Sequence, residues 1–151
     1  MQSVTDPSRT GSALALLFRQ VRDAMWARMA KELANRGHDL TFSQYMTLKK
    51  LSAGTTGATD LARAAELNPG AMTRLLDKLA SKGLVVREAD PDDRRAVHIS
   101  LTDAGRTIWR DIDKCGMRVR EAALEGLGES ERNTLTTLLR RVRDNLTSPT
   151  D

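Results

Sequence analysis

Apolar residues near the start of the chain recur three and four positions apart, which is the spacing of an amphipathic helix. This pattern begins at Ser12, continues to about Ala34 and is followed by Gly37, a residue that commonly ends helices. Its apolar positions are Leu14, Leu17, Phe18, Val21, Met25 and Met29. The first ten residues are polar, and we expect them to be frayed.

A second helix is predicted from Thr41 to Leu51. Thr41 is followed three residues later by Gln44, the spacing of a capping box, in which each side chain bonds the other residue's backbone N–H. The apolar face of this helix would bury Phe42, Tyr45, Met46 and Leu48 to varying degrees. Residues 52–59 are small and include two glycines, so they predict a loop.

Residues 59–102 change from helical to alternating periodicity. A short helix with an apolar stripe ends near Leu67, and Asn68 with Pro69 then predicts the capped start of a longer helix that ends at Gly83. Its buried face would hold Met72, Leu75, Leu76 and Leu79, and its outer face Gly70, Thr73, Arg74, Asp77, Lys78 and Ser81. Two β-branched runs around a polar tip with one proline follow and predict a hairpin. Two helices followed by a hairpin predict a winged helix-turn-helix.

Four residues of the hairpin carry a recognisable signature. Asp93, Arg95, Leu101 and Thr102 have the D-x-R-x5-L-T spacing, with TRLLDKLASKGLV before it and TDAGR after it. The sequence therefore resembles the MarR family of bacterial transcription regulators, and more loosely it does so from LTFSQYMTLKKL to the C-terminus. The resemblance implies one domain over residues 1–151, mainly α-helical with a small β-hairpin wing (α+β). Residues 41–102 would form the DNA-binding lobe, and residues 12–36 and 103–147 a helical dimerisation region.

Two further amphipathic helices are predicted after the hairpin. Thr102 would cap a helix to about Gly126, with Ile108, Ile112, Cys115, Val119 and Ala122 in one row. Ser130 would cap a last helix whose apolar stripe is Leu135, Leu138, Leu139, Val142 and Leu146. These terminal helices have little of their own subunit to pack against, so a two-fold homodimer is predicted.

Composition excludes several classes of protein without selecting one. The net charge of +4 suits a polyanionic partner, but eight bases between Arg63 and Arg106 are matched by eight acids, so binding would depend on where charges point. We find no nucleophile–base pair, phosphate loop, metal-ligand cluster or cofactor motif, and therefore expect no enzyme. Without an apolar run that could cross a bilayer or a signal peptide, we expect a cytoplasmic protein with no membrane partner.

The candidates for contact with double-stranded DNA lie on the second helix of the predicted winged helix-turn-helix, which starts at Pro69, and on the hairpin that forms its wing. They are Asn68, Gly70, Ala71, Thr73, Arg74, Lys78, Asp93, Arg94, Arg95 and His98. Arg74 would read base edges in the major groove, Lys78 a phosphate, and Arg95, steadied by Asp93, the minor groove. Two alternatives to DNA binding stay open. The charged helix face and the hairpin tip could be an ordinary solvated surface and a polar turn, or the winged helix could bind another protein.

The family resemblance also implies control by a small molecule, often an aromatic acid, held where the dimer helices meet the DNA-binding lobe. Candidates for such a pocket are Arg22, Trp26, Met29, Tyr45 and Met46, which could supply one cation and soft apolar walls. The alternative is plain core packing, the usual role of methionines at helical spacing. Cys115 lies in an apolar row, so a structural role is favoured over a sensory one.

Overall fold

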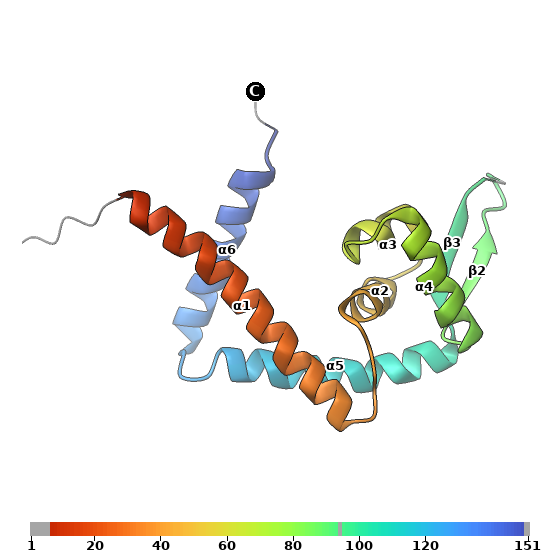
Figure 1. Cartoon of the computed structure of the whole chain (residues 1–151), viewed down its shortest axis with the longest axis horizontal. Coiled ribbons are helices and arrows are strands. Elements are labelled where there is room, and N and C mark those ends of the chain that lie inside the picture. Colours follow the sequence, from red (N-terminus) through yellow and green to blue (C-terminus); the bar gives the residue numbers. More distant parts are fainter. Residues whose placement is uncertain (1–6, 94, 150–151) are drawn as a thin grey trace, which may run out of the picture.

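The computed structural model describes residues 7–93 and 95–149, with side chains from Ala13 onward. The elements are α1 (Pro7–Asn35), α2 (Phe42–Ser52), β1 (Thr56–Gly57), α3 (Ala58–Ala64), α4 (Pro69–Ser81), β2 (Val85–Ala89), β3 (Val97–Leu101), α5 (Asp103–Ala123) and α6 (Glu129–Thr147). The chain is mainly helical with one small antiparallel sheet, as predicted. In Figure 1, helices α2 to α4 and the hairpin form a lobe at one end, and α1 and α6 extend away from it.

One apolar core joins the lobe to the long helices. It includes Leu48 of α2, Leu61 of α3, Met72 of α4 and Ile99 of β3, each at most 1% exposed. Ile112 of α5 belongs to the same cluster, so the lobe and the helical region share one apolar core. Within the lobe the predicted periodicity is confirmed, since Met72, Leu76 and Leu79 are buried while Leu75 is only partly buried.

The sheet has three strands in the order β1-β3-β2, and here the sequence prediction was incomplete. The hairpin pairs Val85 with Leu101 and Ala89 with Val97, whereas Thr56 on the other edge pairs with Ile99. Thr56 and Gly57 had been predicted as part of a loop. A two-residue strand is too short to show alternation, and only its pairing with β3 makes it a strand.

The run TDAGR, which starts at Thr102, forms the junction between the hairpin and α5, and the structure shows why its threonine and glycine are needed there. Gly83 ends α4 with a φ of +72°, a left-handed conformation that glycine adopts without strain. Thr102 caps α5 by accepting the Gly105 N–H at 3.0 Å. A Cβ on Gly105 would lie 2.1 Å from the carbonyl oxygen of Leu84, so only glycine permits this approach of α5 to the sheet.

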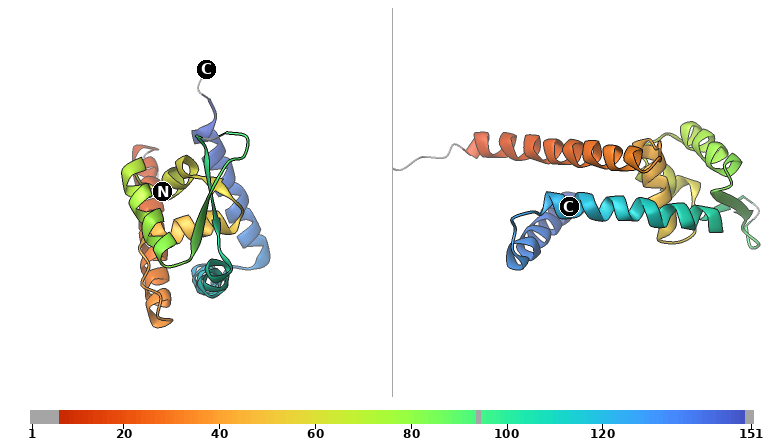
Figure 2. Two further views of the ribbon diagram at one scale, coloured as in Figure 1. Left: turned by 90° about the vertical axis from the view of Figure 1, so that its right-hand side faces the viewer. Right: turned by 90° about the horizontal axis from the view of Figure 1, so that it is seen from below.

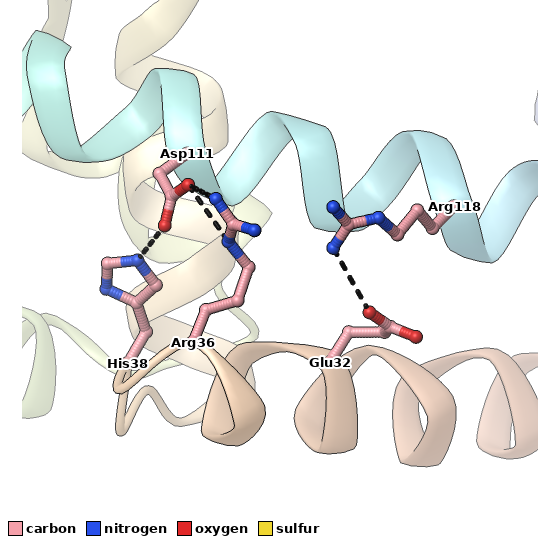
Figure 3. Close-up of polar contacts among 5 residues, drawn as sticks. All are labelled: Glu32, Arg36, His38, Asp111 and Arg118. Atoms are coloured by element: carbon pink, nitrogen blue, oxygen red, sulfur yellow. Dashed lines mark hydrogen bonds and ion pairs between the residues drawn. The ribbon is translucent and has the colours of Figure 1, made fainter.

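The C-terminal part of α1 contacts α5, which it crosses obliquely in Figure 1, and an ion-pair cluster ties the two helices together (Figure 2 gives further views). Asp111 of α5 accepts from Arg36 Nε at 3.0 Å and lies 2.6 Å from His38 Nε2, while Glu32 pairs with Arg118 at 3.6 Å (Figure 3). The hydrogen bond from Arg36, and secondly that from His38, holds the pKa of Asp111 well below its usual range. The cluster fixes the end of α1 just before α2 begins.

Two helix starts differ from the prediction. Helix α1 begins at Pro7 and not at Ser12, so four of the residues expected to be frayed are helical. Proline suits the first helical turn, where no N–H is needed, and this signal was missed. Helix α6 is capped by Gly128 and not by Ser130, because the Gly128 N–H donates to Glu131 Oε1 at 3.0 Å.

The terminal helices leave their apolar faces uncovered in a single chain. Helix α6 has no buried residue, and Leu138 in its predicted stripe is 53% exposed. Among the α1 residues from Ala13 onward, only Met29 and Leu33 are buried, and Leu17 is 55% exposed. Ala122, predicted in the apolar row of α5, is exposed too. Helix α6 overlaps α1 in Figure 1, but Figure 2 shows the two separated. Within the described ranges, no helix is both long and apolar enough to cross a bilayer.

Candidate nucleic-acid interface and adjoining pocket

The outer face of α4 presents polar groups at its start. Asn68 accepts the Ala71 N–H at 2.8 Å, so the first turn of the helix is fixed by its own cap. Arg74 and Lys78 are exposed and point outward, as predicted, whereas Ala71 is half-buried. The Thr73 hydroxyl donates to the Pro69 carbonyl at 3.0 Å, so its proton is already used inside the helix. Lys78 is therefore the better donor to a phosphate.

The wing tip is a turn shaped by two carboxylates. Asp93 accepts the backbone N–H of Arg95 at 3.0 Å, so it fixes the turn and does not hold the Arg95 guanidinium as the sequence reasoning expected. Short polar side chains commonly bond the backbone two residues on, and this local bond is the one that forms. Arg95 is exposed, and Arg94 lies outside the described residues.

His98 of β3, another candidate DNA contact, already has a hydrogen-bond partner in the folded chain. Its Nε2 lies 2.8 Å from Asp90 Oδ2, and the ring is half-buried. Asp90 additionally accepts the Asp92 N–H at 2.8 Å, and the His98 bond, followed by this one, lowers the pKa of Asp90. The bond engages the Asp90 carboxylate near the wing tip, where a negative charge would repel DNA.

Arg87 of β2 connects the wing to α4, a role that sequence reasoning missed. Its Nη2 lies 2.8 Å from Asp77 Oδ1 and donates to the Thr73 carbonyl at 3.3 Å. Because both partners lie on α4, this side chain ties the helix to the hairpin in addition to the apolar core they share. No periodicity or motif pointed to the contact, since the two segments meet only in the folded chain.

A pocket of about 340 Å³ lies where α1, α2 and α5 meet, and it brings together all five residues predicted for a ligand. Its lining consists of Arg22, Met25, Trp26, Met29, Phe42, Tyr45, Met46, Lys49, Gly116, Val119 and Arg120. Trp26 packs edge-on against Phe42, with centroids 5.3 Å apart, and lies 5.7 Å from the Tyr45 ring. The pocket thus has aromatic walls, sulfur-containing side chains and a cationic rim.

Tyr45 links this pocket to the rest of the molecule. Its ring lies 5.9 Å from that of Trp109 and at the same distance from Lys49 Nζ. Burial raises the pKa of Tyr45, with Arg120 opposing and Asp113 reinforcing the shift, so the hydroxyl stays protonated and can donate. Cys115 lies nearby in the core, fully buried, and burial raises the pKa of its thiol, as a structural cysteine requires.

Comparison with known proteins agrees with this architecture. The MarR family model matches residues 40–97, from just before α2 to the start of β3. The multiple antibiotic resistance protein MarR of Salmonella typhimurium is 30% identical over 106 residues, covering 69% of this chain and 74% of that protein. The uncharacterised regulator YhbI of Bacillus subtilis is 36% identical over 106 residues, covering 66% and 69%.

A mutant MarR from E. coli, solved in complex with operator DNA, superposes with a TM-score of 0.71 at 27% identity. The match covers 91% of this chain and 99% of that one. The chain belongs to the MarR family. It is therefore a DNA-binding transcription regulator and not an enzyme, and its sheet and α4 form the winged helix of that family.

Several residues around the pocket of this MarR-family protein were not predicted. Lys49 lies four residues after Tyr45 on α2, so helical spacing alone could have placed it beside the pocket. Met25 lies four residues before Met29, and Phe42 lies three residues before Tyr45, so helical spacing could have placed these two beside the pocket as well. Gly116 and Arg120 come from α5, far along the chain, and only the packing of α5 against α1 and α2 brings them in.

Proposed function

We propose that this MarR-family protein is a homodimer that binds a pseudo-palindromic operator and represses transcription until a small aromatic ligand weakens DNA binding. The observation that carries the proposal is the exposed polar face of α4 beside the wing, with the two elements joined through Arg87. A protein bound over a promoter blocks the polymerase, so binding in the ligand-free state means repression. Because the target is chromosomal DNA, the protein would act in the cytoplasm.

The two parts of the interface would make different contacts. Gly70, Ala71 and Arg74, with Asn68 capping beside them, lie near the start of α4 and would meet base edges in the major groove. Lys78 would bind a phosphate. Thr73 would bind one only if its hydroxyl gives up the hydrogen bond to the Pro69 carbonyl. Arg95 would enter the adjacent minor groove, with Asp93 shaping the turn that carries it. Arg94 and His98 would contact the phosphate backbone of the DNA.

Homodimer formation is supported by the uncovered apolar faces of α1 and α6. Leu135, Leu138, Leu139 and Leu146 are all exposed on α6, and Leu14, Leu17, Phe18 and Val21 on α1. Exposed apolar stripes of this kind mark an interaction site, and a two-fold contact buries the same stripe twice. The two α4 helices of such a dimer would face operator half-sites about 34 Å apart, which is one turn of DNA.

The ligand response is supported by the position of the pocket at the joint between the long helices and the lobe. A ligand that prefers a dimer with a different separation of its two α4 helices would weaken operator binding. A hundredfold loss of DNA affinity requires only about 2.7 kcal/mol of coupling between the two sites. Trp26→Ala should reduce this response while leaving ligand-free DNA binding nearly intact.

The decisive experiment is fluorescence anisotropy of the promoter DNA flanking the protein's own gene, titrated with full-length protein at several salt concentrations. We expect saturable binding with a steep logarithmic salt dependence, and competition by unlabelled promoter but not by random DNA. Analytical ultracentrifugation of the same samples should give a dimer at micromolar concentration. A monomer, or binding that is equal for random DNA, would refute the proposal.

A further inference from the structure

A second cavity lies where the end of α2, the loop after it, β3 and the first turns of α5 meet. Its volume is about 350 Å³, and it shares no lining residue with the α1–α2–α5 pocket. Leu51 and Leu101, which are 3% and 6% exposed, supply buried apolar surface, and the half-buried indole of Trp109 forms one wall. The cavity therefore has the size and the apolar surface to hold a small organic molecule.

Two arginines of α5 line this cavity, and they differ in their partners. Arg106 donates to the Leu101 carbonyl at 2.9 Å and pairs with Asp103. Arg110 is exposed at the cavity, and among residues 13–93 and 95–149 no carboxylate lies within 4 Å of its guanidinium. Within the same ranges no carboxylate lines the cavity. The charge of Arg110 is therefore available to an anion from outside the chain.

Hydroxyl groups from two other elements line the same cavity. Thr55 belongs to the loop after α2, and Ser100 belongs to β3. Neither hydroxyl has a hydrogen-bond partner in the part of the chain that the structure describes, whereas the Ser52 hydroxyl beside them donates to the Lys49 carbonyl at 2.6 Å. The cavity thus offers one guanidinium and two hydroxyls as hydrogen-bond donors, each from a different element.

We propose that this cavity binds a small phosphate monoester, with the phosphoryl group at Arg110 and the organic part against Leu51, Leu101 and Trp109. A guanidinium can bind a phosphoryl group through two parallel hydrogen bonds, and the two hydroxyls can donate to its remaining oxygens. The terminal oxygens of a phosphoryl group point in different directions, so they can accept from donors on three elements. The two oxygens of a carboxylate lie in one plane with its carbon, and they suit this arrangement less well.

The site goes beyond the proposed function, because it needs neither the homodimer nor the operator. None of the residues proposed to contact DNA lines the cavity. In Figure 1 the start of α5 lies at the foot of the hairpin, at the opposite end from the wing tip. A phosphate monoester would therefore have access to this site in the operator-bound protein as well.

The test is proton–nitrogen correlation NMR of the full-length protein, titrated with phenyl phosphate and separately with inorganic phosphate. The chain has two tryptophans and so gives two indole N–H resonances, which the variant Trp26→Phe assigns. We expect phenyl phosphate to shift the Trp109 resonance in a saturable way at millimolar concentration and to leave that of Trp26 nearly unchanged, because only Trp109 lines the cavity. Inorganic phosphate should bind severalfold more weakly, since it has no organic part to place on the apolar surface.

Variants at the cavity test the contacts to the phosphoryl group. Arg110→Gln should weaken the binding of phenyl phosphate tenfold or more, and Ser100→Ala should weaken it severalfold. Lys114→Gln removes an exposed cation four residues further along α5 that does not line the cavity, and it should change binding less than twofold. Thermal unfolding of Arg110→Gln should match that of the parent protein, because the folded chain described here gives this arginine no ion pair to lose.

Five results would overturn the proposal. A shift of the Trp26 resonance without one of Trp109 would place phenyl phosphate in the α1–α2–α5 pocket, and no shift of either at millimolar concentration would exclude the site. Equal binding of inorganic and phenyl phosphate would mean that the apolar surface is not used. Equal weakening by Arg110→Gln and Lys114→Gln would reduce the effect to general electrostatic attraction. A smaller salt slope of promoter binding in Arg110→Gln would make this arginine a DNA contact.

Discussion

Replacing Arg87 by methionine tests whether the joint between α4 and the wing matters for DNA binding. The change removes the ion pair with Asp77 at 2.8 Å and the hydrogen bond to the Thr73 carbonyl at 3.3 Å, while it keeps most of the aliphatic stem. Without this connection only the shared apolar core holds α4 against the hairpin, so we expect the two elements to be less tightly positioned. They must be realigned when both enter adjacent grooves of DNA.

The size of the effect follows from the exposure of the partners. The Arg87 side chain is 33% exposed and that of Asp77 is 62% exposed, so the ion pair is well screened. A pair of this kind contributes about 0.2–1 kcal/mol, and the long bond to the carbonyl adds little. We therefore expect the free energy of unfolding to fall by at most about 1 kcal/mol per subunit. Because a dimer has two such joints, operator binding should weaken by about 0.4–2 kcal/mol, or about twofold to thirtyfold.

The assay is anisotropy on operator DNA across a salt series, with thermal unfolding measured on the same samples. A positioning residue should lower affinity without changing the logarithmic salt slope, because no phosphate contact is lost. Asp77→Asn should weaken binding in the same direction, and the double variant Arg87→Met/Asp77→Asn should be no worse than the worse single variant. Arg110→Met provides the matched loss of one arginine.

Two results would refute this reasoning. If Arg87→Met reduces the salt slope by about one unit per subunit, Arg87 contacts a phosphate directly. If Asp77→Asn strengthens binding and the two changes are additive, the pair does not position α4, and its acid merely repels DNA.

Three further predictions concern other parts of the molecule. Arg74→Ala should weaken operator binding by about 1–3 kcal/mol and relax the preference for particular base pairs, whereas Arg95→Ala should weaken binding to all sites evenly and flatten the salt dependence. Binding to point-mutated operators distinguishes the two variants. An unchanged salt slope in Arg95→Ala would exclude the wing as a DNA contact. Leu139→Glu on α6 should yield monomers that no longer bind operator, measured by sedimentation, and a dimeric variant would place the interface elsewhere. Because the pKa of Asp111 is lowered on folding, its ion pairs stabilise the protein above about pH 4 and are lost as the pH falls further. Asp111→Asn should remove this part of the acid dependence in thermal unfolding, and identical acid profiles would contradict it.

The local features of the DNA-binding lobe were determined by short stretches of sequence. The capping box of Thr41 and Gln44 forms as predicted, with bonds of 3.0 and 3.2 Å. The Asn68 cap and the buried and exposed faces of α4 are also as predicted. These features depend on hydrogen bonds and side-chain periodicity within a few residues, so they can be seen before the fold is known.

The surroundings of the candidate ligand pocket were determined only in part. The family resemblance implied a pocket that includes Trp26, Met29 and Tyr45, and the structure places all three around one pocket. Gly116 and Arg120, which also line this pocket, come from α5. No pattern within α1 or α2 contains that information.

Only the tertiary structure decided which charges meet and which short segments become strands. Arg36 bonds Asp111 across 75 positions of sequence, Arg87 reaches α4 from the hairpin, and Thr56 becomes a strand because β3 offers it an edge. A surface charge has many possible partners in sequence, and each local pattern is compatible with all of them. The choice among them is made by the packing of the apolar core, which fixes how the helices cross and therefore which side chains come within bonding distance.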